Sequence, residues 1–283
     1  MRRIDLHTHS TCSDGSYSVK ELIDYAHEKE LAAIALTDHD TIDGVKEAVT
    51  YGKEKYPDLE VIPGIEFSTV NEGKDVHVVG LYVDYTDQRL KDRLATFKNA
   101  RVERNRKMCK KLTEGGIPIT YEELEKAFPD TAITRAHYAK FMLEKEYIKS
   151  RQEAFDRYIG DNCPYFVPRE NITPEMAIEC ILENGAVPIL AHPVLYHMSD
   201  AKLEALVVRL KEAGLKGLEA IYTTYEAYEE RQMKELAEKH NLLISGGSDF
   251  HGSNKVGIDL GVGHGSLFVP EDILPAIKAS IAR

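Results

Sequence analysis

Short apolar runs alternate with longer amphipathic stretches toward both ends of this chain. Apolar runs bounded by polar turns predict buried strands, and apolar residues three or four positions apart predict helices. The expected strands are Arg3–His7, Ala32–Thr37, Glu60–Ser68, Val76–Val83, Val187–Ala191, Gly217–Tyr222 and Leu242–Ser245. Helices are expected at 18–29, 43–55, 174–184, 200–213 and 225–240, with a last one near Pro270. Seven strands interleaved with helices predict an α/β fold, either a barrel or a doubly wound sheet.

The middle of the chain, residues 87–171, lacks this alternation. Helical patterns are found there at 87–114, 121–127, 135–146 and 152–159, without a strong strand pattern. We therefore expect a helical insertion subdomain at 87–171, placed between two parts of one domain, 1–86 and 172–283. Its first helix carries a basic run that we expect on a solvated face, because acidic residues neighbour it. This run consists of Arg101, Arg104, Arg106, Lys107, Lys110 and Lys111.

The composition limits the partners of the protein. Its 283 residues carry a formal net charge of −11, which is unsuited to broad electrostatic contact with long duplex nucleic acid. A small anionic substrate stays compatible, because bound metal cations can reverse the potential locally. No apolar run approaches the ~20 residues of a membrane span, so we expect no membrane partner. The four cysteines form no close pair, and we expect free thiols and a cytoplasmic location.

Histidines and acidic residues gather where the predicted strands end. His7 and His9 are two residues apart at the end of the first strand, so their side chains share a face. Similar residues lie in or after the other strands: Asp14, Asp38, His39, Asp40, Glu66, His77, His192, Asp249 and His251. In a barrel or a doubly wound sheet, the carboxyl ends of parallel strands form the ligand-binding end. Imidazole and carboxylate together suit manganese, iron or zinc, so the pattern predicts a site for more than one metal.

A structural interpretation exists for each residue alone. A lone histidine is often only hydrogen-bonded, and Asp38 and Asp40 suit turns and helix caps. These interpretations do not predict convergence of so many ligand types on one end of a sheet. Several carboxylates packed together would also repel one another unless cations were bound.

Together these motifs resemble the PHP (polymerase and histidinol phosphatase) family of metal-dependent phosphoesterases. The segments that carry the resemblance are Asp5-Leu6-His7-Thr8-His9-Ser10 with Asp14-Gly15, Leu36-Thr37-Asp38-His39-Asp40, Pro63-Gly64-Ile65-Glu66, Ala191-His192-Pro193 and Gly247-Ser248-Asp249-Phe250-His251. The resemblance implies a distorted (β/α)7 barrel with a helical insertion, or cap, subdomain. It also implies two to three divalent metal ions, manganese, iron or zinc.

The resemblance assigns nine ligands to these metals. His7, His9, Glu66 and Asp249 would hold the first metal. Glu66 would bridge to a second metal, which His77 and His192 would complete. Asp14, His39 and His251 would hold the third.

The resemblance also implies an activity. Within the insertion, Ile133-Thr134-Arg135-Ala136-His137 is similar to the branch that includes the 3′,5′-nucleoside bisphosphate phosphatases and related enzymes acting on nucleotides or short RNA ends. We expect hydrolysis of a phosphomonoester of a small nucleotide, a 3′,5′-nucleoside bisphosphate or a nucleoside monophosphate, by a water that the metals activate. The alternatives are a histidinol-phosphate phosphatase, a 5′-3′ exonuclease on short RNA, and a non-catalytic PHP domain.

Other residues are candidates for contact with the substrate. Arg135 would bind a phosphate through its fork of donors at the start of a helix capped by Thr134. His137, Arg169 and Tyr225 are further candidates for substrate binding; Tyr225 stands where relatives often carry a histidine. Three residues are candidates for proton transfer to the leaving group: Asp38, Asp40 and His197.

Overall fold

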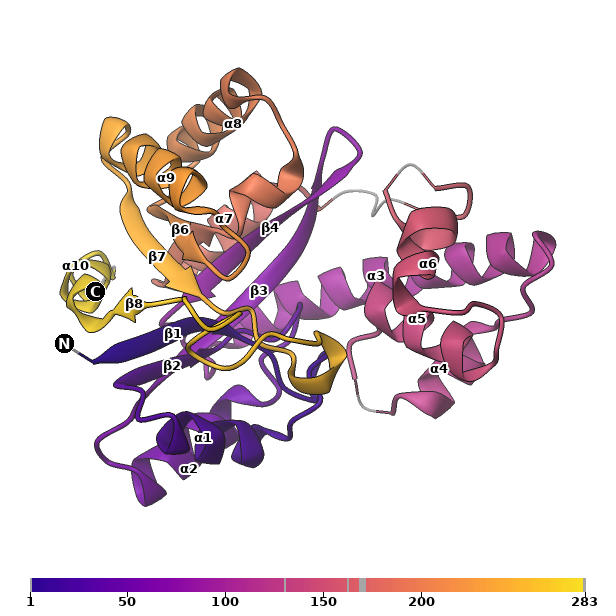
Figure 1. Ribbon diagram of the computed structural model, residues 1–283, viewed down its shortest axis with the longest axis horizontal. Helices are drawn as coiled ribbons and strands as arrows, with labels where there is room; N and C mark the ends of the chain where they lie inside the picture. The colour runs from indigo at the N-terminus through magenta and orange to yellow at the C-terminus, as the bar shows by residue number, and fades with distance from the viewer. Residues whose placement is uncertain (1, 130, 162, 168–171, 282–283) are drawn as a thin grey trace.

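The computed structural model describes residues 2–129, 131–161, 163–167 and 172–281 (Figure 1). The strands are β1 (Arg3–Thr8), β2 (Ala33–Leu36), β3 (Glu60–Asn71), β4 (Lys74–Leu81), β5 (Val187–Leu190), β6 (Gly217–Tyr222), β7 (Leu243–Gly247) and β8 (Val269–Pro270). The α-helices are α1 (Val19–Glu28), α2 (Val45–Lys55), α3 (Gln88–Glu114), α4 (Tyr121–Ala127), α5 (Arg135–Glu144), α6 (Arg151–Ala154), α7 (Pro174–Glu183), α8 (Asp200–Glu212), α9 (Ala227–Lys239) and α10 (Leu274–Ala279). Short turns of π- or 3₁₀-helix are η1 (Phe155–Ile159), η2 (Pro193–Tyr196), η3 (Gly252–Asn254) and η4 (Glu271–Ile273).

The strands form one sheet in the order β7-β6-β5-β4-β3-β2-β1-β8. β4 runs antiparallel to both of its neighbours, β8 runs antiparallel to β1, and the remaining pairs are parallel. The predicted distorted barrel is therefore confirmed, with all seven expected strands. The two-residue β8 was not predicted, because so short a segment carries no periodic pattern.

The sheet closes into a barrel where β1 meets the chain that follows β7. Asp249 N donates a hydrogen bond to His7 O, and His9 N donates one to Phe250 O, both at 2.9 Å. Gly247 allows this approach, because a Cβ atom there would lie only 2.5 Å from His7 Cβ. The closure thus brings the first and last strand motifs of the sequence side by side.

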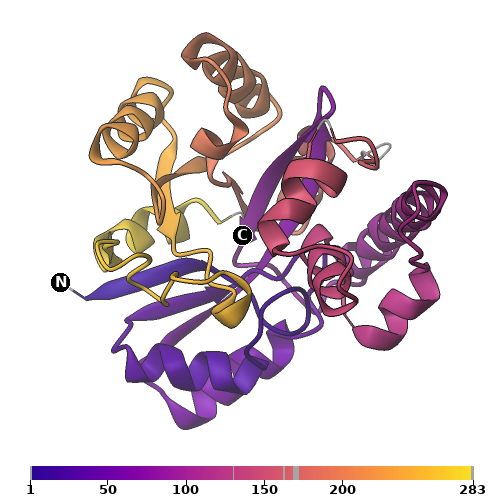
Figure 2. The same cartoon turned by 45° about the vertical axis from the view of Figure 1, so that its right-hand side comes forward.

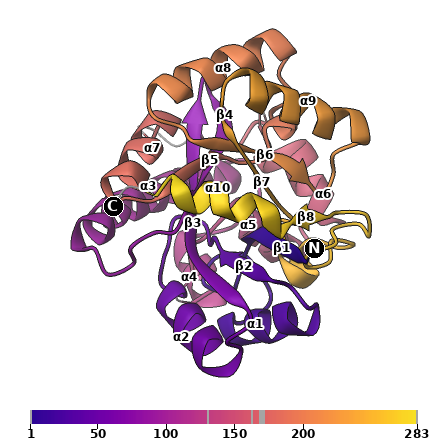
Figure 3. The same ribbon diagram turned by 90° about the vertical axis from the view of Figure 1, so that its left-hand side faces the viewer.

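Apolar side chains fill both sides of the sheet. Ile4 and Leu6 of β1 pack inside the barrel with residues such as Ile62 and Ile189, and α10 covers the end of this cluster (Figure 3). The larger cluster lies between the sheet and α1, α2, α7, α8 and α9. Each large apolar side chain buried in this way contributes about 1.5–3 kcal/mol. Several of the polar candidate ligands follow directly after these apolar strands.

The helices α3 to α6 lie to one side of the barrel (Figures 1 and 2). The first half of α3 buries Leu90, Leu94 and Phe97 in the larger cluster on the outside of the sheet. Its second half buries Met108 and Leu112 in a separate apolar cluster with α4 and α5. α3 thus contributes to both apolar cores. The expected boundaries of the insertion subdomain, at residues 87 and 171, stay a prediction.

The prediction that the whole basic run of α3 is solvated was wrong. Arg101 and Arg104 are buried, with only 3% and 6% of their surface exposed. Arg101 continues the buried stripe of Leu90, Leu94 and Phe97 at three- and four-residue spacing, so it faces the barrel. Arg106, Lys107, Lys110 and Lys111 are exposed as expected.

Within the described ranges, none of the helices has both the length and the apolar surface that a membrane crossing requires.

A histidine takes part in the cap of α5. Thr134 N donates a hydrogen bond to His137 Nδ1 at 2.9 Å, and Thr134 Oγ1 accepts one from Ala136 N. The ring of His137 is buried against Phe128, with 4.6 Å between centroids. Burial lowers the pKa of His137 to about 4, and Nδ1 can accept the bond only while it is unprotonated.

This cap predicts a pH-dependent stability. The unfolded chain binds the proton near pH 6.5 and the folded chain near pH 4, so stability is complete above pH 6.5 and falls on acidification. The loss should reach about 3 kcal/mol by pH 4. His137→Gln keeps an oxygen acceptor that does not titrate. We expect urea unfolding to show a wild-type advantage that shrinks between pH 7 and pH 4; a constant difference would contradict the cap.

Candidate metal centre

The nine predicted ligands converge at one end of the barrel. β1 provides His7, and the loop after it provides His9 and Asp14. Glu66 and His77 lie within β3 and β4, and the loops after β2, β5 and β7 provide the other four: His39, His192, Asp249 and His251. All are buried except His77, which is partly exposed. Seven of the nine residues form three groups whose ligand atoms lie within 4.8 Å of one another: His9–Asp14–His39–His251, His7–His9–Glu66 and His39–Glu66–His77.

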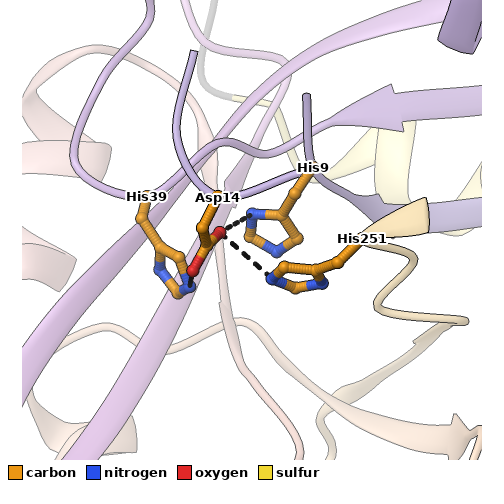
Figure 4. Close-up of side chains that lie close together, drawn as sticks. All are labelled: His9, Asp14, His39 and His251. Atoms are coloured by element: carbon orange, nitrogen blue, oxygen red, sulfur yellow. Dashed lines mark ion pairs between the residues drawn. The ribbon is translucent and has the colours of Figure 1, made fainter. Parts of the chain in front are cut away.

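The first group, here called the outer cluster, consists of His9, Asp14, His39 and His251 (Figure 4). Asp14 lies at its middle. Its Oδ1 is 3.1 Å from His251 Nε2 and 3.8 Å from His9 Nδ1, and its Oδ2 is 3.8 Å from His39 Nε2. A carboxylate flanked by three imidazoles is a donor set that divalent transition metals accept.

Glu66 is the centre of the other two groups. Its Oε2 lies 3.2 Å from His7 Nε2, 3.3 Å from His9 Nε2 and 3.1 Å from His39 Nδ1. Its Oε1 lies 2.8 Å from His77 Nδ1 and 3.2 Å from His192 Nε2. The two oxygens therefore face different sets of histidines, which is the arrangement required of a bridging ligand. Asp249 Oδ1 adds a second carboxylate, 3.3 Å from His9 Nε2.

The donor atoms of this centre fit a divalent cation. His7 Nε2, His9 Nε2 and Glu66 Oε2 are buried and have no hydrogen-bond partner among the described residues. Unsatisfied buried polar atoms are rare and unfavourable, and a shared cation would satisfy all three. Burial alone would raise the pKa of Glu66, but His39, His7 and His77 hold it well below its usual value. The carboxylate is thus ionised and ready to bind a cation.

Glu219 supports this centre and was missed by the sequence analysis. It lies on β6 with 1% of its surface exposed. Its Oε1 is 2.8 Å from His7 Nδ1, and its Oε2 accepts a hydrogen bond from His192 N at 2.7 Å. Because an ionised carboxylate can only accept, this contact favours a proton on His7 Nδ1 and leaves Nε2 facing the centre. A single acid within an otherwise apolar strand was the available signal.

The three candidates for proton transfer lie in different surroundings. Both oxygens of Asp38 accept hydrogen bonds from the hydroxyl groups of Ser10 and Ser13, at 2.6 Å. Asp40 accepts a bond from Ser68 N and forms an ion pair with Arg101. His197 is exposed and lines a separate surface cavity with Lys74 and Arg209. The role of each in proton transfer stays a prediction.

A cavity of about 190 Å³ opens beside the outer cluster. Four cationic side chains line it, Arg101, Arg104, Arg135 and Lys255, together with Asp14, His39, His77 and His251. Lys255, which the sequence analysis missed, contacts Asp249 Oδ2, and Tyr222 donates a hydrogen bond to the same oxygen. The cavity places positive charge directly beside the candidate metal ligands.

The predicted substrate-binding residues differ in their access to this cavity. Arg135 lines it, but its guanidinium also forms 2.7 Å ion pairs with Asp75 and Asp161. His137 is occupied in the cap of α5, and the hydroxyl oxygen of Tyr225 accepts a hydrogen bond from Val194 N at 3.3 Å. Neither of these two residues lines the cavity. Arg169 lies outside the described residues.

Known proteins resemble the chain over most of its length. The PHP domain family matches residues 5–166. A 5′-3′ exoribonuclease of Haemophilus influenzae is 36% identical and is aligned over 88% of this chain and 90% of its own. A 3′,5′-nucleoside bisphosphate phosphatase of Chromobacterium violaceum is 30% identical over 92% of this chain and 91% of its own.

Solved structures agree with this assignment. An amidohydrolase from Chromobacterium violaceum, with bound sulfate and no metal, superimposes with a TM-score of 0.86 at 29% identity, over 99% of this chain and 98% of its own. A protein from Bifidobacterium adolescentis described as a metal-dependent phosphoesterase gives a TM-score of 0.84 at 26% identity, over 99% and 96%. The family match, the relatives and the His/Asp/Glu centre agree: this chain belongs to the PHP family and is a metal-dependent phosphoesterase.

Proposed function

We propose that the protein hydrolyses a phosphomonoester of a small nucleotide, a 3′,5′-nucleoside bisphosphate or a nucleoside monophosphate. The observation that carries this proposal is the cationic cavity beside the outer cluster. A chain with a net charge of −11 repels anions at long range, so an anionic substrate needs local positive charge. The four cationic side chains that line the cavity supply such charge beside the centre, and arginine suits phosphate because its donors form a planar fork.

We infer that the nine ligands hold two or three divalent ions, Mn²⁺, Fe²⁺ or Zn²⁺. When bound, the metals supply a water activated near neutral pH and neutralise charge on the phosphoryl group. Glu66 faces one set of histidines with each of its two oxygens, and Glu219 orients His7. The leaving oxygen requires a proton or a positive charge. Lys255 lines the cavity, so it is better placed for this task than Asp38 or His197.

A bisphosphate fits this cavity better than histidinol phosphate does. Histidinol phosphate carries an amine that is cationic at neutral pH, which the arginines and Lys255 would repel. A second phosphate would instead interact favourably with them. A non-catalytic role is disfavoured, because seven of the nine candidate ligands form groups that could hold a metal ion.

A 5′-3′ exonuclease acting on short RNA is the second candidate. Two relatives that are 36% and 33% identical carry the name 5′-3′ exoribonuclease. Arg101 also borders a further cavity, of about 210 Å³, which Lys91, Lys98 and Tyr121 line. Lysines combined with an aromatic ring suit the next nucleotide of a short single strand. The two candidates differ in whether the bond cleaved is a monoester or a diester.

A substrate panel tests the proposed function. The purified protein, supplied in turn with Mn²⁺, Fe²⁺ and Zn²⁺, is incubated with 3′,5′-bisphosphates, 5′-monophosphates, histidinol phosphate and short 5′-phosphorylated RNA. We expect phosphate release from a bisphosphate, measured colorimetrically, and no release from histidinol phosphate. Nucleotide release from RNA without phosphate release would favour the second candidate. Hydrolysis of none of these compounds would exclude both.

Asp249→Asn tests the ligand set. The amide is a poorer metal ligand, so we expect the variant to lose metal and at least about 100-fold in turnover. Asp259→Asn is the matched control, because Asp259 follows in the same region of the chain but bonds Tyr25 and Lys29 instead. Metal content is measured by elemental analysis after dialysis. Full metal content and turnover in Asp249→Asn would show that the ligand set is wrong.

Arg104→Gln tests the cavity. Loss of a charge-assisted hydrogen bond to phosphate should lower kcat/KM by about 10- to 100-fold, mostly through KM. Arg106→Gln is the control on the same helix, because Arg106 is exposed and pairs with Glu122. Steady-state kinetics on the best substrate of the panel give both constants. Equal kcat/KM values in the two variants would show that the substrate phosphate does not contact Arg104.

A further inference from the structure

We propose that the insertion holds one metal position of the barrel, and that Thr134 is the positioning residue through which it does so. The metal position concerned is the outer cluster. This proposal depends on the centre binding metal, as inferred above, and adds that one of its sites is built jointly by the barrel and the insertion.

Thr134 contacts a ligand of the outer cluster directly. Its Oγ1 donates a hydrogen bond to Asp14 Oδ2 at 2.9 Å, and both residues are buried. The orientation of Thr134 is set from its other side, because its N donates to His137 Nδ1. With Oδ2 held in this way, Asp14 Oδ1 faces His251 Nε2 at 3.1 Å. The cap of α5 therefore fixes the orientation of a ligand carboxylate.

A second connection reaches His39. Ser68 Oγ lies 3.2 Å from His39 Nδ1 and accepts a hydrogen bond from Arg101 Nη2, also at 3.2 Å. Arg101 belongs to α3 and donates a further bond to Ile133 O, just before Thr134. The same part of the insertion thus supports two ligands of the outer cluster.

A third connection passes through the loop after β7. Asn254 Nδ2 donates a hydrogen bond to Asp14 O at 2.9 Å. Arg151 of α6 in turn donates to Asn254 O at 3.1 Å. Both the backbone and the side chain of Asp14 are therefore linked to helices of the insertion.

The rest of the centre is supported differently. His7 and His192 are held by Glu219, which lies on strand β6 of the barrel. Supporting partners of metal ligands affect metal affinity about 10- to 100-fold each. Loss of the Thr134 contact should therefore weaken the outer cluster and leave the sites around Glu66 intact. By linkage, metal at the outer cluster and docking of the insertion should strengthen each other.

Three variants test this proposal with Mn²⁺ alone as the probe. Thr134→Val removes the hydroxyl, Thr134→Ser keeps it, and Thr120→Val is the matched control. Thr120 caps α4 with the same kind of capping box, and among the described residues its hydroxyl bonds only with Glu123. Bound Mn²⁺ is counted after dialysis, and its affinity is measured by calorimetric titration without substrate.

We expect Thr134→Val to bind one equivalent of Mn²⁺ about 10- to 100-fold more weakly and the others unchanged. Thr134→Ser and Thr120→Val should match the wild type. Unchanged affinity in Thr134→Val overturns the proposal, as does equal weakening in Thr120→Val or a parallel loss of every equivalent. A wild-type protein that binds no Mn²⁺, Fe²⁺ or Zn²⁺ would instead refute the proposed function, on which this inference rests.

Discussion

The closure of the barrel between β1 and the segment after β7 is the contact on which the rest of the centre depends. Two backbone hydrogen bonds place His7 and His9 against Asp249 and Phe250. Asp249 and His192, both at strand ends, have positive φ angles of 55° and 29°, which residues other than glycine rarely adopt. The surrounding structure must hold this strained backbone, and such strain is typical of functional sites. Without the closure, the first and last ligand motifs would lie on opposite edges of an open sheet.

Charge is organised in two layers around this contact. The inner layer consists of buried carboxylates and imidazoles whose unsatisfied atoms face one another, an arrangement that favours bound cations. The outer layer consists of the arginines and Lys255 at the cavity, on a protein that is otherwise strongly acidic. These cationic side chains therefore lie directly beside the candidate metal ligands.

The insertion completes the site. α3 joins the two cores, because its first half packs on the barrel and its second half packs on α4 and α5. Arg101, between the two halves, pairs with Asp40 after β2 and also donates to Ile133 O. The same segment thus lines the cavity and supports ligands of the outer cluster. Because of this arrangement, the residues that would bind the substrate are connected to the metal ligands through the insertion itself.

The strands were predictable from the sequence alone, because each apolar run is local, and the family resemblance named the nine candidate ligands. An apolar run followed by His-x-His or Asp-His-Asp predicts a strand and also the polar side chains that follow it. The supporting residues were not predictable, because their partners are remote. Glu219 contacts His7 from 212 residues away, and Thr134 contacts Asp14 from 120 residues away. Arg104 was misjudged because its helical stripe faces a barrel that no local pattern describes. The sequence by itself therefore determined the types of candidate ligand, whereas only the tertiary structure decided which remote residues contact them and which basic residues line the cavity.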